Sequence, residues 1–156
     1  MASHPTGLAL LLSQLGSVAT EEFATAIAPL GLTPPLAGVL RLIATTPGVS
    51  QRELALTMGA APSRIVVHLD ELEALDVIVR EKSDDRRVNR VRLTEQGTAL
   101  MARLRGAVAR ADATLADGLD ADTRDALIAA LRTVADRRGV APEVHPGMRV
   151  VRGRRS

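Results

Sequence analysis

The amino-acid sequence predicts a mainly α-helical protein that carries one small β-hairpin. Apolar residues recur at steps of three and four in six segments, which is the period of an amphipathic helix. Only residues 77–94 change to β-branched residues and alternation, the pattern of paired strands. Phe23 is the only aromatic residue among 156, and the resulting core of Leu, Val, Ala and Ile favours helix packing.

The first two predicted helices are marked by their ends. Residues 6–30 place apolar side chains on one helical face, and Gly31 is a natural stop. Thr33 predicts an N-cap, because Pro34 follows at the first helical position, where no amide donor is needed. This second helix ends at Pro47-Gly48, and its buried residues are predicted to be Leu36, Val39, Leu40 and Ile43.

A helix-turn-helix is predicted next. Ser50 and Glu53 have the spacing of a capping box, in which the side chain of each residue accepts a hydrogen bond from the backbone amide of the other. This third helix closes at Gly59, and Pro62 begins a fourth helix. Two short helices joined by a tight glycine-containing turn form a helix-turn-helix. The inward face of the fourth helix is predicted to be Ile65, Leu69, Leu72 and Leu75.

The β-hairpin follows directly. Residues 77–82 and 88–94 predict two strands, and residues 83–87 a charged turn between them. Alternation puts apolar side chains on one face of the second strand and arginines on the other, Val91 and Leu93 against Arg90 and Arg92. A hairpin beside a helix-turn-helix is a wing. The predicted core is therefore a winged helix-turn-helix.

Two more helices complete the prediction. Thr94 caps a fifth helix and Asp120 a sixth, and they end near Gly118 and Gly139. A winged core does not need the apolar stripes of the first, fifth and sixth helices. We therefore expect these helices to pair across a two-fold axis in a homodimer.

Composition excludes several classes of site. The chain has no Cys, so disulfides, thiolate metal sites and thiol redox sensing are excluded. His4, His68 and His145 lack ligand spacing, and no catalytic triad or Gly-rich phosphate loop occurs. We expect no metal, no cofactor and no enzymatic activity. The absence of a secretory leader and of a long apolar run predicts a cytoplasmic protein without a membrane partner.

Three segments carry a resemblance to a known family. They are Glu53-Leu54-Ala55, Leu69-Asp70-Glu71-Leu72-Glu73, and the run that leads from Asp85-Arg86-Arg87 to Leu93-Thr94-Glu95-Gln96-Gly97. The chain thus resembles the MarR family of transcriptional regulators. The resemblance implies a sequence-specific regulator of double-stranded DNA, expected to be a repressor. The two-fold pairing of the first, fifth and sixth helices would set the recognition helices roughly 34 Å apart, on a pseudo-palindromic operator of about 16–20 base pairs.

The resemblance divides the chain into four parts. Residues 1–32 are expected to form an N-terminal dimerisation helix, 33–94 the winged helix-turn-helix DNA-binding lobe, 95–138 the C-terminal dimerisation helices, and 139–156 a basic, mobile tail. The tail arginines could follow DNA phosphates or only solubilise the chain end, and the sequence favours neither.

The fourth helix is expected to enter the major groove by its first turn. Arg64 can bind both acceptors of a guanine edge, and Ser63 is a second polar reader. Val67 can contact a thymine methyl group, and His68 can reach a phosphate or a base. The alternative is that Ser63 and Arg64 only solvate the helix terminus.

The wing supplies the other expected contacts. By resemblance, Arg87 inserts into a narrow minor groove, where negative potential is concentrated. Asp85 is expected to position the wing, by fixing the turn or by holding an arginine. Further expected phosphate contacts are Arg86, Arg90 and Arg92 from the hairpin and Arg52 from the third helix. The alternatives are a solvated hairpin tip and, for Arg52, a surface salt bridge.

Three departures from the family pattern bear on DNA recognition. Asp76 stands where glycine is usual, at a turn that Asp can still form in the left-handed conformation. Ala61 replaces a frequent serine N-cap, which is expected to cost roughly 1 kcal/mol of helix stability. Val66 and Val67 occupy the predicted exposed face of the recognition helix, where polar residues are common. Readout by hydrogen bonds is therefore expected to be thin.

A small-molecule effector is implied by the resemblance as well. Its cleft would be lined by residues such as Leu15, Leu36, Leu40 and Leu104, for which plain helix packing is the alternative. Two rival functions stay open beside the specific regulator. One is a winged-helix module that binds another protein, which the valines favour and the arginine-rich wing opposes. The other is a DNA binder that does not select sequence.

Overall fold

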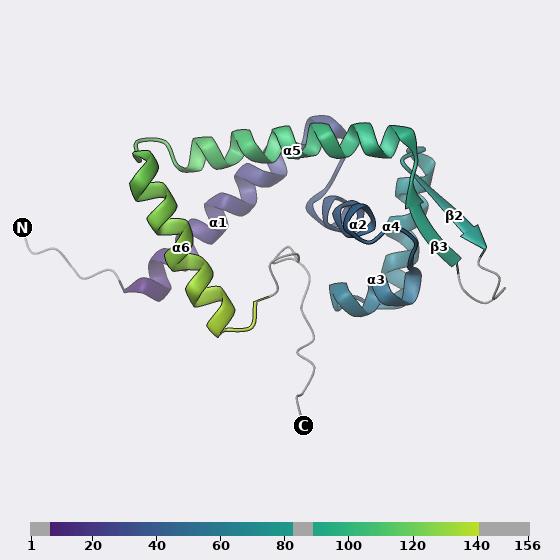
Figure 1. The fold of residues 1–156 in the computed structure, drawn as a ribbon, viewed down its shortest axis with the longest axis horizontal. Coiled ribbons are helices and arrows are strands. Elements are labelled where there is room, and N and C mark those ends of the chain that lie inside the picture. Colours follow the sequence, from purple (N-terminus) through teal and green to yellow (C-terminus); the bar gives the residue numbers. More distant parts are fainter. Residues whose placement is uncertain (1–6, 83–88, 141–156) are drawn as a thin grey trace, which may run out of the picture.

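The computed structural model describes residues 7–82 and 89–140 of the chain. It contains six α-helices and a small antiparallel sheet, which confirms the predicted fold class (Figure 1). The elements are α1 (Leu8–Ile27), a 3-10 turn η1 (Ala28–Leu30), α2 (Pro34–Thr45), β1 (Val49–Ser50), α3 (Gln51–Met58), α4 (Pro62–Ala74), β2 (Ile78–Lys82), β3 (Asn89–Leu93), α5 (Glu95–Leu115) and α6 (Ala121–Arg137).

The predicted helix starts are confirmed by their caps. The Thr33 hydroxyl accepts from the amide of Leu36 at 3.5 Å. The capping box of α3 is complete, because Ser50 Oγ accepts from the amide of Glu53 at 3.2 Å and Glu53 Oε2 accepts from the amide of Ser50 at 2.8 Å. Ala61, by contrast, gives α4 no side-chain cap. The third helix is thus fixed locally, whereas α4 depends on packing for its start.

The sheet has a third strand that the sequence pattern did not predict. Its order is β1-β3-β2, and Val49 of β1 pairs with Val91 of β3. This pairing fastens the loop before α3 to the base of the hairpin. The hairpin is therefore joined to the helix-turn-helix by backbone hydrogen bonds as well as by packing.

One hydrophobic core unites α2, α3, α4, the sheet and the first half of α5. The predicted inward residues of α4 are fully buried, except for Leu75, whose residue is 43% exposed. Leu75 was wrongly predicted to lie inside because α4 ends at Ala74, so the helical period no longer directs its side chain. Val66 is half-buried, so of the two valines only Val67 is freely exposed.

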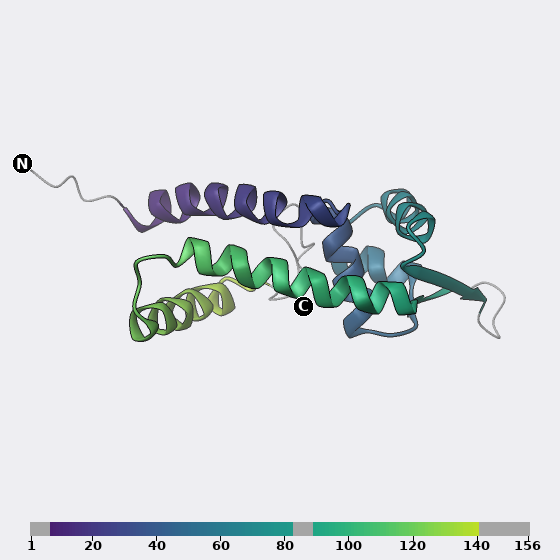
Figure 2. The same cartoon turned by 90° about the horizontal axis from the view of Figure 1, so that it is seen from above.

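Helix α5 leads from the hairpin to α6 along the long axis of the molecule, and α1 packs against it (Figure 2). Helix α6 turns back at the end of α5 that lies away from the hairpin (Figure 1). Both α1 and α6 leave large apolar side chains exposed, namely Leu8, Leu10, Leu11, Leu12, Leu15 and Val18 on α1 and Leu127, Ile128, Leu131 and Val134 on α6. Among the described residues no single helix is long and apolar enough to cross a membrane. The bent pair Leu8–Leu30 and Pro34–Thr45 together has the length and composition of a membrane span.

The junction of α4, β2 and α5 is built around two backbone features. Asp76 adopts the predicted left-handed conformation, with φ of 56°, and its carbonyl accepts from Thr94 Oγ1 at 2.7 Å. Gly97 in the first turn of α5 lies against the backbone of Val77, and a Cβ atom built on Gly97 would overlap the Val77 carbonyl oxygen. The close approach of α5 to the hairpin therefore requires glycine.

Candidate nucleic-acid interface

Helices α2, α3 and α4 and the hairpin gather at one end of the molecule, away from α6 (Figure 1). Gly59 makes the turn between α3 and the segment before α4, with a positive φ of 57°. The buried side of α4 is held by Ile65, Leu69 and Leu72. Its opposite side therefore faces solvent, and the helix itself packs against β2 of the hairpin.

The exposed side of α4 carries three of the predicted DNA-contacting residues. Ser63 and Arg64 lie in its first turn, and Val67, with 51% of its surface exposed, lies one turn later. Arg64 forms no ion pair within the described part of the chain. A free guanidinium beside an apolar side chain is suited to a guanine edge next to a thymine methyl group.

His68 is placed differently from the prediction. Its side chain is half-buried, and both ring nitrogens are shielded from solvent without a hydrogen-bond partner in the described residues. In this orientation the imidazole presents no nitrogen to a phosphate or a base. This placement does not support the contact predicted for His68.

The start of α3 is bordered by two arginines. Arg52 is exposed in the first turn and forms no ion pair within residues 7–82 and 89–140. Arg90 of β3 donates from Nη1 to the carbonyl of Gly48 at 3.1 Å, which holds its guanidinium beside this helix start. Hydrogen bonds from Ser50 lower the pKa of Glu53, and the nearby charge of Arg90 lowers it further. The capping carboxylate is thus kept ionised next to the arginine.

One more arginine of the hairpin forms an ion pair, on the strands that lead to the wing tip. Arg92 Nε lies 3.2 Å from Glu81 Oε2, an exposed ion pair across the two strands. The residues expected at the wing tip, Asp85, Arg86 and Arg87, lie outside the described residues. Their contacts therefore remain predictions.

A three-residue ion cluster connects α4 with β2. The sequence analysis did not predict this cluster. Arg80 Nη2 lies 2.6 Å from Asp70 Oδ1 and also contacts Glu73 Oε2, which accepts from Arg80 Nε at 3.0 Å. The hydrogen bond from Arg80 lowers the pKa of Glu73. The two carboxylates in turn raise the pKa of Arg80. The available signal was the spacing of three between the acids, which places them on one side of the helix.

The four residues expected to line an effector cleft are divided between the core and the surface of a single copy of the chain. Leu36, Leu40 and Leu104 belong to the closed hydrophobic core, while Leu15 is 53% exposed on α1. For the three core residues the structure favours the alternative, plain helix packing.

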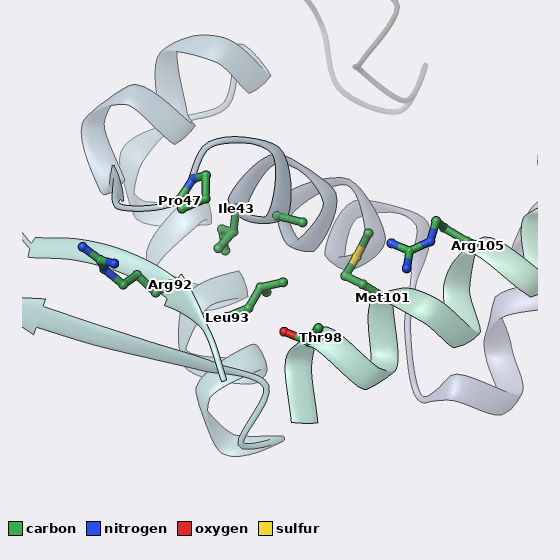
Figure 3. Close-up of a pocket in the computed structure, with 8 residues that line it drawn as sticks. Ile43, Pro47, Arg92, Leu93, Thr98, Met101 and Arg105 are labelled. Carbon is green, nitrogen blue, oxygen red and sulfur yellow. The ribbon is translucent and has the colours of Figure 1, made fainter. Parts of the chain in front are cut away.

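A cavity of about 390 Å³ opens instead between α2, β3 and α5. It has an apolar floor and two arginines, with lining residues Ile43, Ala44, Pro47, Arg92, Leu93, Thr98, Met101 and Arg105. Arg92 and Arg105 stand at its two ends, with Leu93 and Met101 between them (Figure 3). A cavity of this kind suits a small organic acid, because the carboxylate can bind a guanidinium while the rest of the ligand covers the floor.

Comparison with known proteins agrees with this geometry. A model of the MarR family matches residues 30–87. A protein of Thauera aromatica named for regulation of the hcr operon is 39% identical over 103 residues, which are 65% of this chain and 62% of that protein's length. The HTH-type transcriptional repressor Rv2887 of Mycobacterium tuberculosis is 36% identical over 107 residues, 68% of this chain and 77% of the repressor.

Solved structures extend the match over most of the chain. The transcriptional repressor CouR bound to a 23-mer DNA duplex has a TM-score of 0.72 and 35% identity, covering 86% of this chain and 99% of that one. Rv2887 in complex with p-aminosalicylic acid has a TM-score of 0.69 and 32% identity, covering 83% of this chain and 98% of that one.

Proposed function

The chain belongs to the MarR family, and from this premise we propose that it is a sequence-specific regulator of transcription that represses by binding double-stranded DNA in the cytoplasm, and that it has no enzymatic activity. The observation that carries the proposal is the exposed side of α4. It presents Ser63, Arg64 and Val67 to solvent on a helix that packs against β2 of the hairpin, with Arg64 free of any ion pair in the described part of the chain.

In the proposed complex, the first turn of α4 enters the major groove. Arg64 binds a guanine edge and Val67 a thymine methyl group. Arg52 and Arg90 flank the start of α3 and bind backbone phosphates, which set the register without reading sequence. Arg87 in the wing takes the neighbouring minor groove, with Arg86 on a phosphate and Asp85 positioning the turn.

A homodimer supplies the second half-site. The apolar side chains that α1 and α6 leave exposed support this, because a single copy does not bury them. Residues 1–32 and 95–138 then form the dimerisation region and 33–94 the DNA-binding lobe, with the basic segment 139–156 beyond it. Two lobes roughly 34 Å apart fit a pseudo-palindromic operator.

Replacing Arg64 by alanine is expected to weaken binding and to relax the base preference at one position per half-site. Selection from a random duplex library with the wild-type protein supplies the probe, and fluorescence anisotropy measures affinity. A lost bidentate contact costs about 1–3 kcal/mol, or roughly fivefold to over a hundredfold in Kd. Arg87→Ala is expected to weaken binding mainly to duplexes with an A·T-rich minor groove.

Arg103→Ala is the matched control, because it removes the same charge from the exposed surface of α5. It is expected to change affinity by less than about twofold, since Arg103 is outside the proposed interface. If the wild-type protein enriches no sequence from the library, it is not a sequence-specific regulator. Binding to all duplexes alike would then indicate a sequence-independent DNA binder, and binding to no duplex would indicate a protein-binding module.

We further propose that the cavity between Arg92 and Arg105 takes an aromatic acid that releases the protein from DNA. Salicylate at millimolar concentration is the probe. Arg105→Ala is expected to raise the concentration needed for release by about tenfold, because one charge-assisted hydrogen bond is lost. Its DNA affinity without salicylate should equal that of the wild type. An unchanged response in Arg105→Ala, or none in the wild type, would remove this cavity as the salicylate site.

A further inference from the structure

The Arg80 clamp, defined as Arg80, Asp70 and Glu73, joins the two elements that are proposed to meet DNA. Asp70 and Glu73 lie on the second half of α4, and Arg80 lies on β2, only a few residues before the wing tip. Within residues 7–82 and 89–140 no other ion pair connects α4 with the hairpin. The clamp is therefore the one charged link between recognition helix and wing in the described part of the chain.

The register of the sheet fixes where Arg80 points. Alternation places it on the same face of β2 as Ile78, which is 2% exposed, and the antiparallel pairing sets it opposite the buried Val91. This is the face that packs against α4. The stem of Arg80 thus continues the hydrophobic contact of the strand with the helix, and its guanidinium reaches Asp70 and Glu73 at the edge.

The geometry of the cluster constrains direction as well as distance. Arg80 uses both Nε and Nη2, so the plane of its guanidinium is fixed relative to the helix. Two carboxylates three residues apart on a helix repel one another unless a cation lies between them. Removal of Arg80 therefore changes both the link and the charge on the part of α4 that follows Val67.

The clamp lies at the surface, outside the apolar core. The side chains of Asp70 and Glu73 are 56% and 42% exposed and that of Arg80 is 22% exposed, so solvent screens both ion pairs. The apolar core beneath holds α4 and β2 together without it. The core and the pairing of β1 with β3 hold the base of the hairpin as far as Arg90 and its partner Glu81, and beyond them the hairpin leaves the body of the molecule (Figure 1).

We propose that Arg80 is a positioning residue, held by Asp70 and Glu73, that sets the wing relative to the recognition helix and thereby determines selectivity among DNA sequences. The proposal rests on the DNA-binding function proposed above. Asp70 and Glu73 act through Arg80 and touch no DNA themselves. Their loss frees the wing to bind phosphates out of register with the major-groove contacts.

The sharpest test is the double variant Asp70→Asn/Glu73→Gln in the full chain. Its probes are the library-selected duplex and a scrambled duplex of equal length and composition. Removing two negative charges strengthens attraction to any duplex. The positioning role predicts opposite signs instead, with tighter binding to the scrambled duplex and weaker binding to the selected one. The ratio of the two affinities is expected to fall by about tenfold, roughly the discrimination that one base contact supplies.

Two further variants separate positioning from charge and from folding. Glu71→Gln lies on the same helix outside the clamp, and it should tighten binding to both duplexes by the same factor. Arg80→Gln should lose selectivity while the slope of log affinity against log salt stays unchanged. A slope smaller by about 0.9 would instead mark Arg80 as a phosphate contact and overturn the proposal. All three variants should keep Tm within about 4 °C of the wild type.

The proposal is also overturned if the double variant gains affinity equally for both duplexes, because the acids would then act only by repulsion. Equal gain for both duplexes differs from failure of the proposed function. If the proposed function fails, the wild-type protein enriches no duplex from the library, and there is no selectivity to lose.

Discussion

Replacing Gly97 by alanine is expected to lower the free energy of unfolding by about 3 kcal/mol or more, well above the usual effect of one added methyl group. The added Cβ would overlap the carbonyl oxygen of Val77 and lie 3.0 Å from its carbonyl carbon. Both atoms belong to the backbone, so no rotamer change can relieve the contact. Helix α5 or the start of the hairpin must move instead.

That movement would break bonds that hold the junction together. The Val77 carbonyl accepts from the amide of Thr94 at 3.1 Å, and the Thr94 hydroxyl caps α5 by accepting from the amide of Gly97 at 3.0 Å. A shift large enough to admit a methyl group strains both. Urea unfolding followed by circular dichroism measures the loss, which corresponds to a decrease in Tm of roughly 6 °C or more.

Gly106→Ala on the same helix is the matched control. A Cβ there meets only the flexible end of Arg110, at 3.5 Å. Because alanine is favoured over glycine inside a helix, this variant is expected to gain up to about 1 kcal/mol. Equal stability of the two variants would show that α5 can move away from Val77 without cost, contrary to the close packing of Gly97 against the Val77 carbonyl.

Features governed by neighbours in sequence were predicted correctly. The capping box of Ser50 and Glu53 involves residues three apart, so its geometry follows from the start of a helix alone. The left-handed turn at Asp76 was predicted from the few residues that tolerate this conformation. The exposure of Ser63, Arg64 and Val67 follows from the helical period once Ile65 and Leu69 are assigned to the core.

Features that depend on contacts distant in sequence were missed. Strand β1 has two residues, too few for a period, and exists only because Val49 pairs with Val91. The hydrogen bond from Arg90 to the carbonyl of Gly48 joins residues 42 apart in the sequence, so it was not predicted, although Arg90 itself was predicted as a phosphate contact. The Arg80 clamp likewise joins a helix to a strand. His68 is half-buried at the border of the inward face of α4, where the helical period alone does not decide whether its nitrogens reach solvent.

Disrupting the apolar face of α6 is expected to abolish dimerisation and with it most of the DNA affinity. Leu127 and Leu131 lie one turn apart on this helix and are 47% and 40% exposed, so both are accessible to a second copy. Changing both to Gln removes apolar contact without altering net charge or opening the core of one copy. Affinity for the selected duplex is expected to fall by about a hundredfold or more, because the second half-site no longer binds intramolecularly.

Sedimentation measures the oligomeric state, and anisotropy measures binding to duplexes with one and two half-sites. The variant should bind both duplexes alike, whereas the wild type should prefer two half-sites strongly. Thr133→Gln, a polar exchange on the same helix, should remain dimeric. If Leu127→Gln/Leu131→Gln stayed dimeric with full affinity, the exposed face of α6 would not be the interface, and α1 and α5 would have to hold the two lobes at the spacing of one DNA turn. A wild-type protein that sediments as a monomer at micromolar concentration would remove the two-fold arrangement altogether, because then nothing sets the distance between half-sites.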